Sequence, residues 1–268
     1  MIVLGFDTAT RSSAVGLRMA DGATLRARDD PREGEHPGHA TRLLGMAGEL
    51  LATAGLSFGD LDRVAVGVGP GRFTGLRVGV ATARGLAQSL SLELVGVSSL
   101  RALAEAALPG TAGGGARAAA PSVEEARGQD GPPAVIAVID ARRGEAFATA
   151  RCITADGPAR EFEFPLALTP TELERVVERA ELLGAQSGQR WLAVGDGALR
   201  FRDQLESAGA TVAPDESALH LVDGGAICLI GASTPAAASF EDVVPDYRRP
   251  PDARASGDSP AVAESVTT

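Results

Sequence analysis

A pattern of apolar strand, aspartate, turn and second strand occurs twice in this chain and narrows the choice of folds. The first copy reads IVLGFDTATRSSAVGLRMADGATLRARDD, and the second reads AVIAVIDARRGEAFATARCITADGPAREFEF. Asp7 and Asp140 end the two apolar strands, and Asp21 and Asp156 lie in matching Ala-Asp-Gly turns. An internal duplication is the economical explanation, and it predicts two domains of one design.

The elements around these copies alternate between strands and helices. After a three-strand meander, apolar spacing predicts a helix over 39–55 that stops at Gly55, a strand, a helix over about 74–90 and a further strand. In the second half we expect a helix over 171–183, a strand from residue 191, a helix over 199–207 and a final helix over 220–232. This order fits the α/β class.

Composition shifts place the domain boundaries. We expect a first domain over 1–107, joined by the returning segment 218–240, and a second domain over 134–217. Residues 108–133 are rich in Gly, Ala and Pro without an apolar period, which predicts a flexible insertion or linker. Residues 241–268 form a tail whose last part we expect to be disordered.

Charge and cysteine usage exclude several classes of protein. The chain carries 35 acidic against 25 basic side chains, a net charge of −10, whereas a free-standing nucleic-acid binder normally has the opposite balance. Cys152 and Cys228 stand far apart and outside any CxxC pair, so they read as buried, reduced thiols. Met1 leads directly into a strand and no run of apolar residues is long enough to span a membrane, so we expect a cytoplasmic protein.

A glycine-rich turn, VGVGPGRFTGLRVG, joins a strand to the helix over about 74–90 and raises the question of phosphate binding. The chain contains no lysine, which excludes a Walker A loop and a Schiff-base mechanism. The turn therefore serves some purpose other than a P-loop.

Two tandem domains of this kind resemble the actin, sugar-kinase and Hsp70 class, which holds ATP between its domains. The motifs DTAT.SSAVGL, GPGRFTGLRVG, IDARRGE and GDGA occur in order along nearly the whole chain, and they resemble the TsaB family of bacterial tRNA threonylcarbamoyladenosine synthesis. Two departures are Arg72, where that family usually has serine, and His39-Ala40-Thr41, where it has His-Ser-Glu.

Comparison with TsaD, the catalytic paralogue that this resemblance implies, predicts no metal site. Where TsaD has HxxxH this chain reads Ser98-Ser99-Leu100-Arg101-Ala102-Leu103, and Asp223 alone stands where the third ligand would be. His36 and His39 are separated by Pro37-Gly38, which favours a turn and a helix start over a metal pair. A serine-nucleophile triad has no support, because Ser12 and Ser13 have no histidine near them in sequence and His220 is solitary.

Whether this chain binds ATP depends on the loops that follow the repeated strands. Asp7 and Thr8 resemble the first phosphate loop of the kinase class, and Gly195 and Gly197 resemble its adenosine loop, so all four are candidate vestigial nucleotide-binding residues. The second phosphate loop should be glycine-rich, yet residues 141–145 read Ala-Arg-Arg-Gly-Glu. We therefore expect no catalytic residue, no metal and no cofactor in this chain.

The helices over 39–55 and 74–90 are the candidate partner interface. Gly75, Gly79 and Ala83 recur at every fourth position and would let another helix approach closely. The alternative is that this stripe packs on the protein's own sheet. In the family that the chain resembles, this helix pair docks the catalytic paralogue, and the predicted contact residues are Leu43, Leu44, Ala47, Leu51, Gly75, Leu76, Gly79, Val80 and Ala83.

The resemblance implies a non-catalytic scaffold that pairs with a TsaD-like subunit, for threonylcarbamoyl transfer to the adenosine beside the anticodon in tRNAs reading codons that begin with A. The implied partners are TsaD, the small ATPase TsaE, and tRNA only through the complex, with a homodimer as an alternative in the free state. A kinase or ATPase of the actin-like class and a metallopeptidase-like protein are the rival functions.

Overall fold

The computed structural model describes residues 1–32, 34–108, 134–154, 157–164, 166–184 and 191–248. Two five-stranded sheets organise these residues, in the strand orders β3-β2-β1-β4-β5 and β10-β9-β6-β7-β8. The strands of the first sheet are β1 Val3–Asp7, β2 Ser13–Arg18, β3 Thr24–Asp29, β4 Arg63–Gly69 and β5 Glu93–Ser98. Those of the second are β6 Ala134–Arg142, β7 Glu145–Thr154, β8 Gly157–Glu163, β9 Trp191–Val194 and β10 Thr211–Val212.

The two sheets share one topology. In each, the first three strands form an antiparallel meander and two later strands add in parallel on the side of the first strand. Residues from β1 and β6 occupy equivalent central positions, with Asp7 at the end of one and Asp140 near the end of the other. This correspondence agrees with the internal repeat in the sequence.

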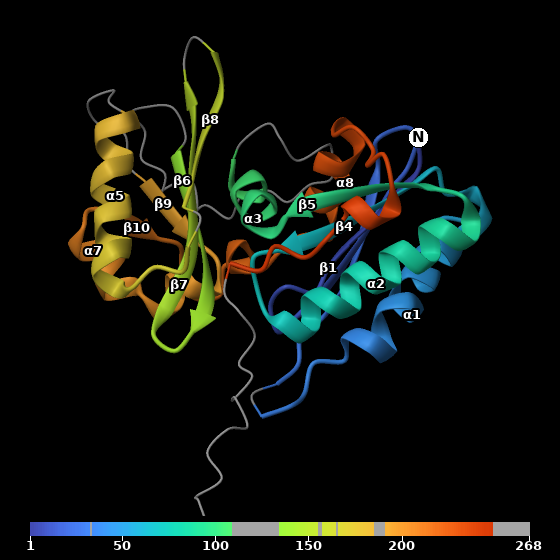
Figure 1. Cartoon of the computed structure of the whole chain (residues 1–268), viewed down its shortest axis with the longest axis horizontal. Helices are drawn as coiled ribbons and strands as arrows, with labels where there is room; N and C mark the ends of the chain where they lie inside the picture. The colour runs from blue at the N-terminus through green and yellow to red at the C-terminus, as the bar shows by residue number, and fades with distance from the viewer. Residues whose placement is uncertain (33, 109–133, 155–156, 165, 185–190, 249–268) are drawn as a thin grey trace, which may run out of the picture.

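Helices cover the first sheet on both faces (Figure 1). Helices α1 His39–Thr53 and α2 Phe73–Leu90 lie side by side on one face, where they bury the side chains of Leu4 and Phe6. Helices α3 Ser99–Ala107 and α8 Gly224–Ser233 lie on the other face. Successive side chains of β1 point to opposite faces of the sheet, so Val3 packs with α8 while Leu4 packs with α1 and α2.

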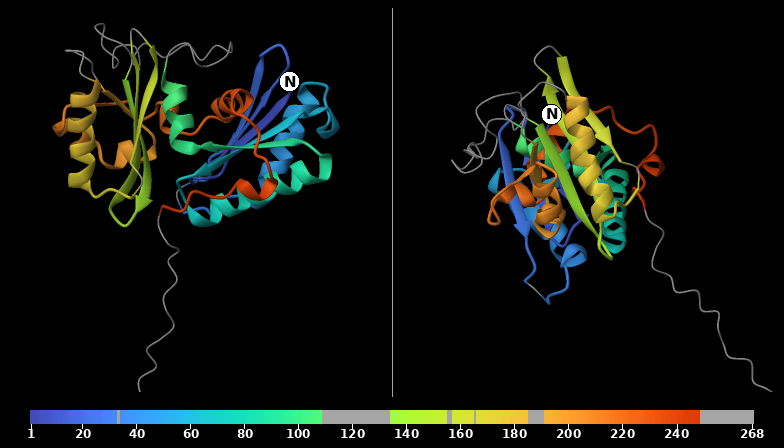
Figure 2. Two further views of the ribbon diagram at one scale, coloured as in Figure 1. Left: turned by 45° about the horizontal axis from the view of Figure 1, so that its top comes forward. Right: turned by 90° about the vertical axis from the view of Figure 1, so that its left-hand side faces the viewer.

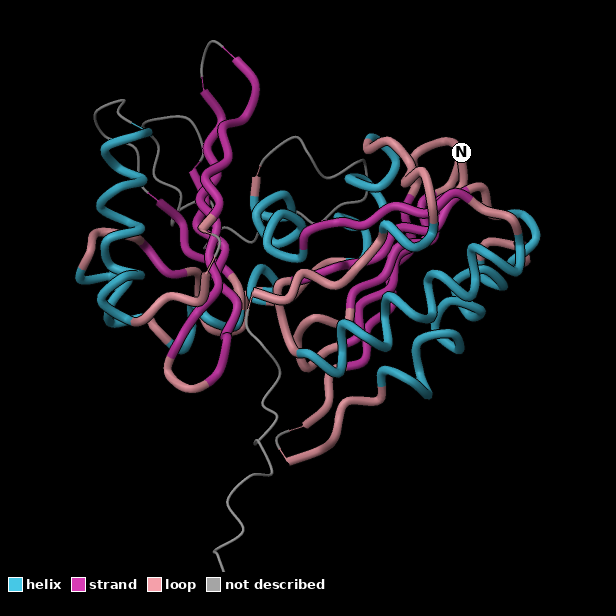
Figure 3. The backbone as a smooth tube through the Cα atoms, viewed as in Figure 1, coloured by secondary structure: helices cyan, strands magenta, loops and turns pink. Residues whose placement is uncertain are grey.

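The second sheet is covered by α5 Pro170–Gly184 and α7 Arg202–Ser207 on its outer face, and α6 Asp196–Arg200 follows β9 (Figure 2). Its inner face packs against α3, which therefore lies between the two sheets (Figure 3). One apolar cluster contains Leu100 and Leu103 of α3 together with Ile139 of β6 and Ile227 of α8. Arg151 of β7 also forms an ion pair with Glu105 of α3, at 2.8 Å. The domains are thus joined by a shared core.

Most of the predicted elements are present. The helix predicted over 39–55 ends as expected, because Gly55 adopts a φ of +69° just after it. Sequence patterns did not predict α3 or β10, and the helix predicted over 199–207 is two short helices that meet at Phe201. The final helix begins at Gly224 rather than at residue 220, because Asp223 caps it by accepting a hydrogen bond from the Gly225 N–H at 2.8 Å.

Several predictions fall on residues outside the description. Except for Leu108, the predicted linker 108–133 lies outside the described residues, as does the tail from residue 249.

Both cysteines are buried and unpaired, as predicted, and burial raises the pKa of the Cys228 thiol to about 12. Among the described helices, none combines the length and the apolar content that crossing a membrane requires.

Candidate functional site

The Asp7 carboxylate at the end of β1 is enclosed by its own domain. It accepts hydrogen bonds from the Ala9 N–H at 2.7 Å and from the Ser99 hydroxyl at 2.5 Å, and it is only 1% exposed. Burial raises its pKa, and the two hydrogen bonds oppose that effect only in part. A Cβ on Gly67 would lie 1.8 Å from the carboxylate oxygen. Asp7 therefore joins β1, β4 and α3 and presents no free oxygen at the strand end.

Thr8, Gly195 and Gly197 also have packing roles. The Thr8 hydroxyl donates to the Gly75 carbonyl at 2.7 Å, which holds the start of α2 on the end of β1. Gly195 has a φ of +102°, and a Cβ there would lie 2.0 Å from the Val138 carbonyl. A Cβ on Gly197 would lie 2.8 Å from the Ile139 backbone. The structure thus brings the four predicted vestigial residues to the strand ends and gives each a structural task.

Charged groups of both domains lie near one another at these strand ends. Burial lowers the pKa of Arg72, which occupies the N-cap position of α2, and the nearby charges of Arg142 and Arg11 lower it further. Asp140 and Asp196 act in the opposite direction on the pKa of Arg72. Burial raises the pKa of Asp196 from 3.8 to about 6, although its carboxylate accepts a hydrogen bond from the Asp140 N–H at 3.0 Å.

The raised pKa of Asp196 predicts a pH dependence. Because the folded state binds this proton more tightly than the unfolded state, the contribution of Asp196 is most favourable below about pH 4 and is lost as pH rises toward 6. Asp196→Asn keeps the acceptor oxygen and removes the charge. We expect it to stabilise the protein above pH 6 by on the order of 2 kcal/mol, allowing for partial exposure. Urea unfolding of both proteins between pH 4 and 8 measures this, and equal pH profiles would contradict it.

The histidines are placed by contacts that the sequence could not predict. His39, at the start of α1, is buried, and its Nδ1 lies 2.8 Å from the Ser13 hydroxyl of β2. Sequence distance hid this pair, since 26 residues separate the two partners. Ser13 is also buried, so the pair fastens α1 to the sheet instead of exposing a nucleophile. Burial, followed by the charge of Arg72, lowers the pKa of His39.

His36 is exposed, and His220 is buried with ring nitrogens 3.0–3.1 Å from the carbonyls of Gly195, Ala213 and Pro214. Asp223 accepts a hydrogen bond from Arg26 at 3.0 Å in addition to capping α8. The described residues contain no group of three or more His, Cys, Asp or Glu side chains placed to hold a metal ion.

The burial of the predicted interface residues in α1 and α2 contradicts the prediction that this helix pair offers a second exposed apolar surface. Of the nine predicted interface residues only Leu44 is exposed, at 49%. The other eight are buried in the first domain: Leu43, Ala47, Leu51, Gly75, Leu76, Gly79, Val80 and Ala83. The stripe of small residues on α2 packs on Thr8, because a Cβ on Gly75 would lie 2.0 Å from the Thr8 carbonyl. The alternative, that the stripe packs on the protein's own sheet, is therefore correct.

The opposite side of the helix pair carries a group of small residues and Leu44, although charged and polar residues such as Arg42, Glu49 and Gln88 are also exposed on these helices. We define the outer face by exposed or half-buried residues of α1 and α2: Thr41, Leu44, Gly45, Gly48, Ala52, Thr74, Ala81 and Gly85. A Cβ on Gly45 or Gly85 would meet nothing within 4 Å, and one on Gly48 would meet only Phe58 at 3.9 Å. Packing within the monomer therefore does not require these three glycines. Their spacing in HATRLLGMAGELLAT and RVGVATARG was the signal that sequence analysis passed over.

Comparison with known proteins agrees with this architecture. Residues 33–155 match a family model described as TsaD, tRNA N6-adenosine threonylcarbamoyltransferase. The Escherichia coli tRNA threonylcarbamoyladenosine biosynthesis protein TsaB is 32% identical, over 81% of this chain and 80% of that protein. Its Haemophilus influenzae namesake is 37% identical over 40% of this chain and 43% of that protein.

Among solved structures, YeaZ from Pseudomonas aeruginosa matches with a TM-score of 0.65 and 25% identity, over 91% of this chain and 100% of that one. Two α/β domains of one topology that share one core are thus the fold that this chain has in common with YeaZ. The chain belongs to the TsaB family.

Proposed function

We propose that this chain is a non-catalytic subunit in tRNA threonylcarbamoyladenosine synthesis, and that it docks a TsaD-like catalytic subunit on the outer face of α1 and α2. The complex would transfer threonylcarbamoyl to the adenosine beside the anticodon, with a TsaE-like ATPase as a further partner and with tRNA held through the complex. The two relatives that are named tRNA threonylcarbamoyladenosine biosynthesis proteins support the assignment of this chain to that pathway. The outer face supports the docking role.

The three glycines of the outer face carry the argument. Glycine inside a helix is less stable than alanine by about 1 kcal/mol, because glycine loses more backbone freedom on folding. At Gly45, Gly48 and Gly85 the helices are less stable than they would be with alanine, although the monomer leaves room for a side chain at each position. A partner helix that lies against these positions would explain them, since the absence of Cβ atoms lets two helix axes approach closely.

Leu44 fits the same explanation. It is one of five large apolar side chains described as exposed, and it lies beside Gly45 and one helical turn before Gly48. An apolar side chain amid small residues forms a knob that a groove on a second helix can bury. In the free protein the outer face could instead meet its own copy, which gives the homodimer that the sequence left open.

The proposal that the chain is non-catalytic rests on the contacts that the residues of the strand-end loops already make within the protein. Asp7 and Thr8 are engaged inside the first domain, and the backbone at Gly195 is in contact with the Val138 carbonyl. These contacts favour a structural role over the kinase alternative. The placement of His36 and His39 similarly disfavours the peptidase alternative.

Gly85→Arg tests the docking proposal. We expect the variant to fold, because Gly85 is exposed with open space around it, and to lose binding to the TsaD-like subunit by at least about 100-fold, since a long charged side chain separates the helices. The measurement is co-purification followed by calorimetric titration, with circular dichroism to verify folding. Thr171→Arg on the exposed side of α5 is the matched control. Unchanged affinity of folded Gly85→Arg would refute the docking face.

A further inference from the structure

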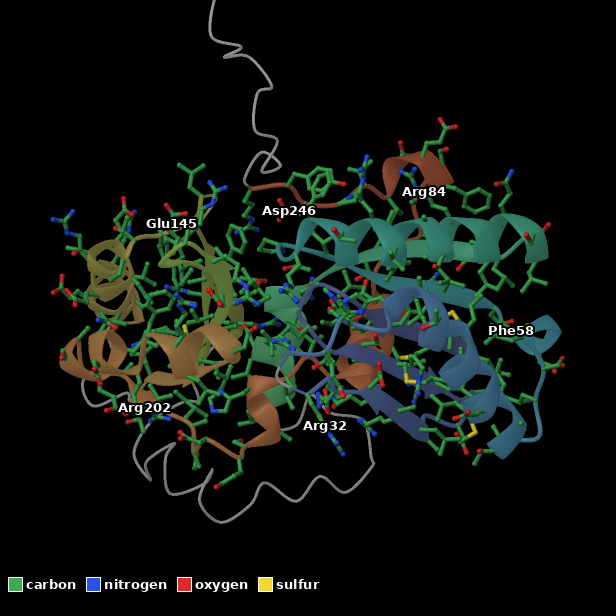
Figure 4. The ribbon with its side chains drawn as sticks, turned by 90° about the horizontal axis from the view of Figure 1, so that it is seen from below. Arg32, Phe58, Arg84, Glu145, Arg202 and Asp246 are labelled. Carbon is green, nitrogen blue, oxygen red and sulfur yellow. The ribbon has the colours of Figure 1, made fainter. Side chains whose placement is uncertain are left out.

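The chain after α8 returns across the first domain as an ordered strap, which we define as residues 235–248. The Ala237 N–H donates to the Leu94 carbonyl at 2.9 Å, and the Asp246 N–H donates to the Val68 carbonyl at 2.7 Å. Between these points Arg84 of α2 donates to the carbonyls of Val243 and Glu241, at 3.0 and 2.8 Å. Figure 4 shows Arg84 beside this part of the strap and Asp246 where the strap reaches the space between the domains.

The strap ends in contact with both domains. The Tyr247 ring lies 5.0 Å from the ring of Phe73 at the start of α2. Arg248 donates to the Phe164 carbonyl of the second domain at 2.6 Å and to the Asp246 carboxylate at 2.8 Å. Val243 is buried, so the strap is anchored by its own side chain as well as by backbone contacts. These anchors hold the neighbouring residues in fixed positions.

Two apolar side chains of the strap nevertheless face solvent. Val244 is 58% exposed and Tyr247 is 44% exposed, and they are two of the five exposed large apolar residues described. Arg77 is also exposed, and its guanidinium lies 4.7 Å from the centre of the Phe73 ring. We call Phe73, Arg77, Val244 and Tyr247 the strap ridge. Tyrosine and arginine are enriched among the residues that dominate binding energies at protein interfaces.

The strap ridge adjoins the outer face of the helix pair. Arg77 lies three residues after Thr74 and four before Ala81 on α2, which puts all three on one side of the helix. Arg77 therefore links the outer face to the strap, because it lies over the Phe73 ring and the Tyr247 ring lies beside Phe73.

The strap lies along the edge of the outer face. Two adjacent helices of this length have a flat footprint about 25 Å long and about 20 Å wide. Arg84 of α2 holds the strap beside that footprint through its hydrogen bonds to the carbonyls of Val243 and Glu241. A subunit that docks on the outer face therefore meets the strap ridge at the edge of the same contact.

We propose that the strap ridge is the second part of the docking surface for the same TsaD-like subunit, an inference that rests on the proposed function. The partner surface would offer an apolar recess to Val244 and Tyr247 and a carboxylate to Arg77. The strap thus makes docking dependent on a segment far from α1 and α2 in sequence.

Val244→Glu tests this inference, because the side chain points to solvent and the strap's anchors stay intact. We expect the Kd for the TsaD-like subunit to rise about 10- to 100-fold, and Arg77→Ala to raise it about 3- to 10-fold. Ala238→Glu places the same charge on an exposed position near the other end of the strap and should leave the Kd unchanged. Circular dichroism verifies folding, and if Val244→Glu is unfolded, Arg77→Ala decides alone.

The outcomes separate the two proposals. If Gly85→Arg abolishes binding while Val244→Glu and Arg77→Ala bind normally, the docking face stands and the strap ridge is refuted. If Gly85→Arg binds normally, the proposed function loses its interface. If the ridge variants bind the subunit normally but lower the affinity of the complex for tRNA, the ridge contacts RNA, and our assignment to the subunit interface is overturned.

Discussion

Ala83→Arg is expected to unfold the protein. Ala83 is fully buried between α2 and the first sheet, in the cluster that contains Leu43 and Val66. An arginine there has no room and leaves a charge without a partner in an apolar core, a combination that destabilises by about 5 kcal/mol or more. That equals the entire stability of many domains. Circular dichroism and thermal unfolding would show a protein without a cooperative transition.

Ala81→Arg is the matched control, because it makes the same change two residues away on the same helix. Ala81 is exposed on the outer face, so this variant should unfold at nearly the normal temperature. By the docking proposal it should also fail to bind the TsaD-like subunit. If Ala83→Arg folds with a normal melting temperature, the burial of α2 on its own sheet is incorrect.

Gly75→Ala is expected to cause the second largest loss, although it adds a single methyl group. The new Cβ would lie 2.0 Å from the Thr8 carbonyl, and this oxygen belongs to the backbone at the end of β1, so it cannot rotate away. Helix α2 would have to move off the sheet and weaken the bond from the Thr8 hydroxyl to the Gly75 carbonyl. We expect a loss of about 3 kcal/mol, or a fall in Tm of about 10 °C.

Gly85→Ala makes the same substitution ten residues later on α2 and should have the opposite effect. Its Cβ would enter open space, so the higher helix propensity of alanine should add about 1 kcal/mol of stability. Thermal unfolding of the two variants side by side tests both expectations. A Gly75→Ala protein as stable as Gly85→Ala would show that the start of α2 does not rest on Thr8.

The contacts of Gly75 and Gly79 with Thr8 explain the glycine-rich turn after β4. Gly75 is the third residue of α2, and Gly79 lies one turn later on the same side of the helix, where a Cβ would lie 2.4 Å from the Thr8 hydroxyl oxygen. Small residues at both positions let α2 lie directly on the end of β1. The motif therefore sets how α2 meets the sheet, and this placement in turn presents the outer face.

The sequence alone determined the features that depend on local patterns. Apolar strands that end at Asp7 and Asp140, each followed by a turn and a second strand, predicted both meanders and the duplication, and helical spacing predicted α1 and α2 to within a few residues. Such patterns can be read from the chain because strand and helix periods are set by neighbouring residues. The motifs also identified the family to which the chain belongs.

Only the tertiary structure decided which side of each helix is covered. Both sides of α2 carry small or apolar residues, so the pattern could not tell the stripe of Gly75 and Gly79 from the side that holds Ala81 and Gly85. The same limit hid the contact of His39 with Ser13 and the return of the strap to α2. Each of these joins residues distant in sequence, and their meeting depends on how helices and sheets pack after the local elements have formed.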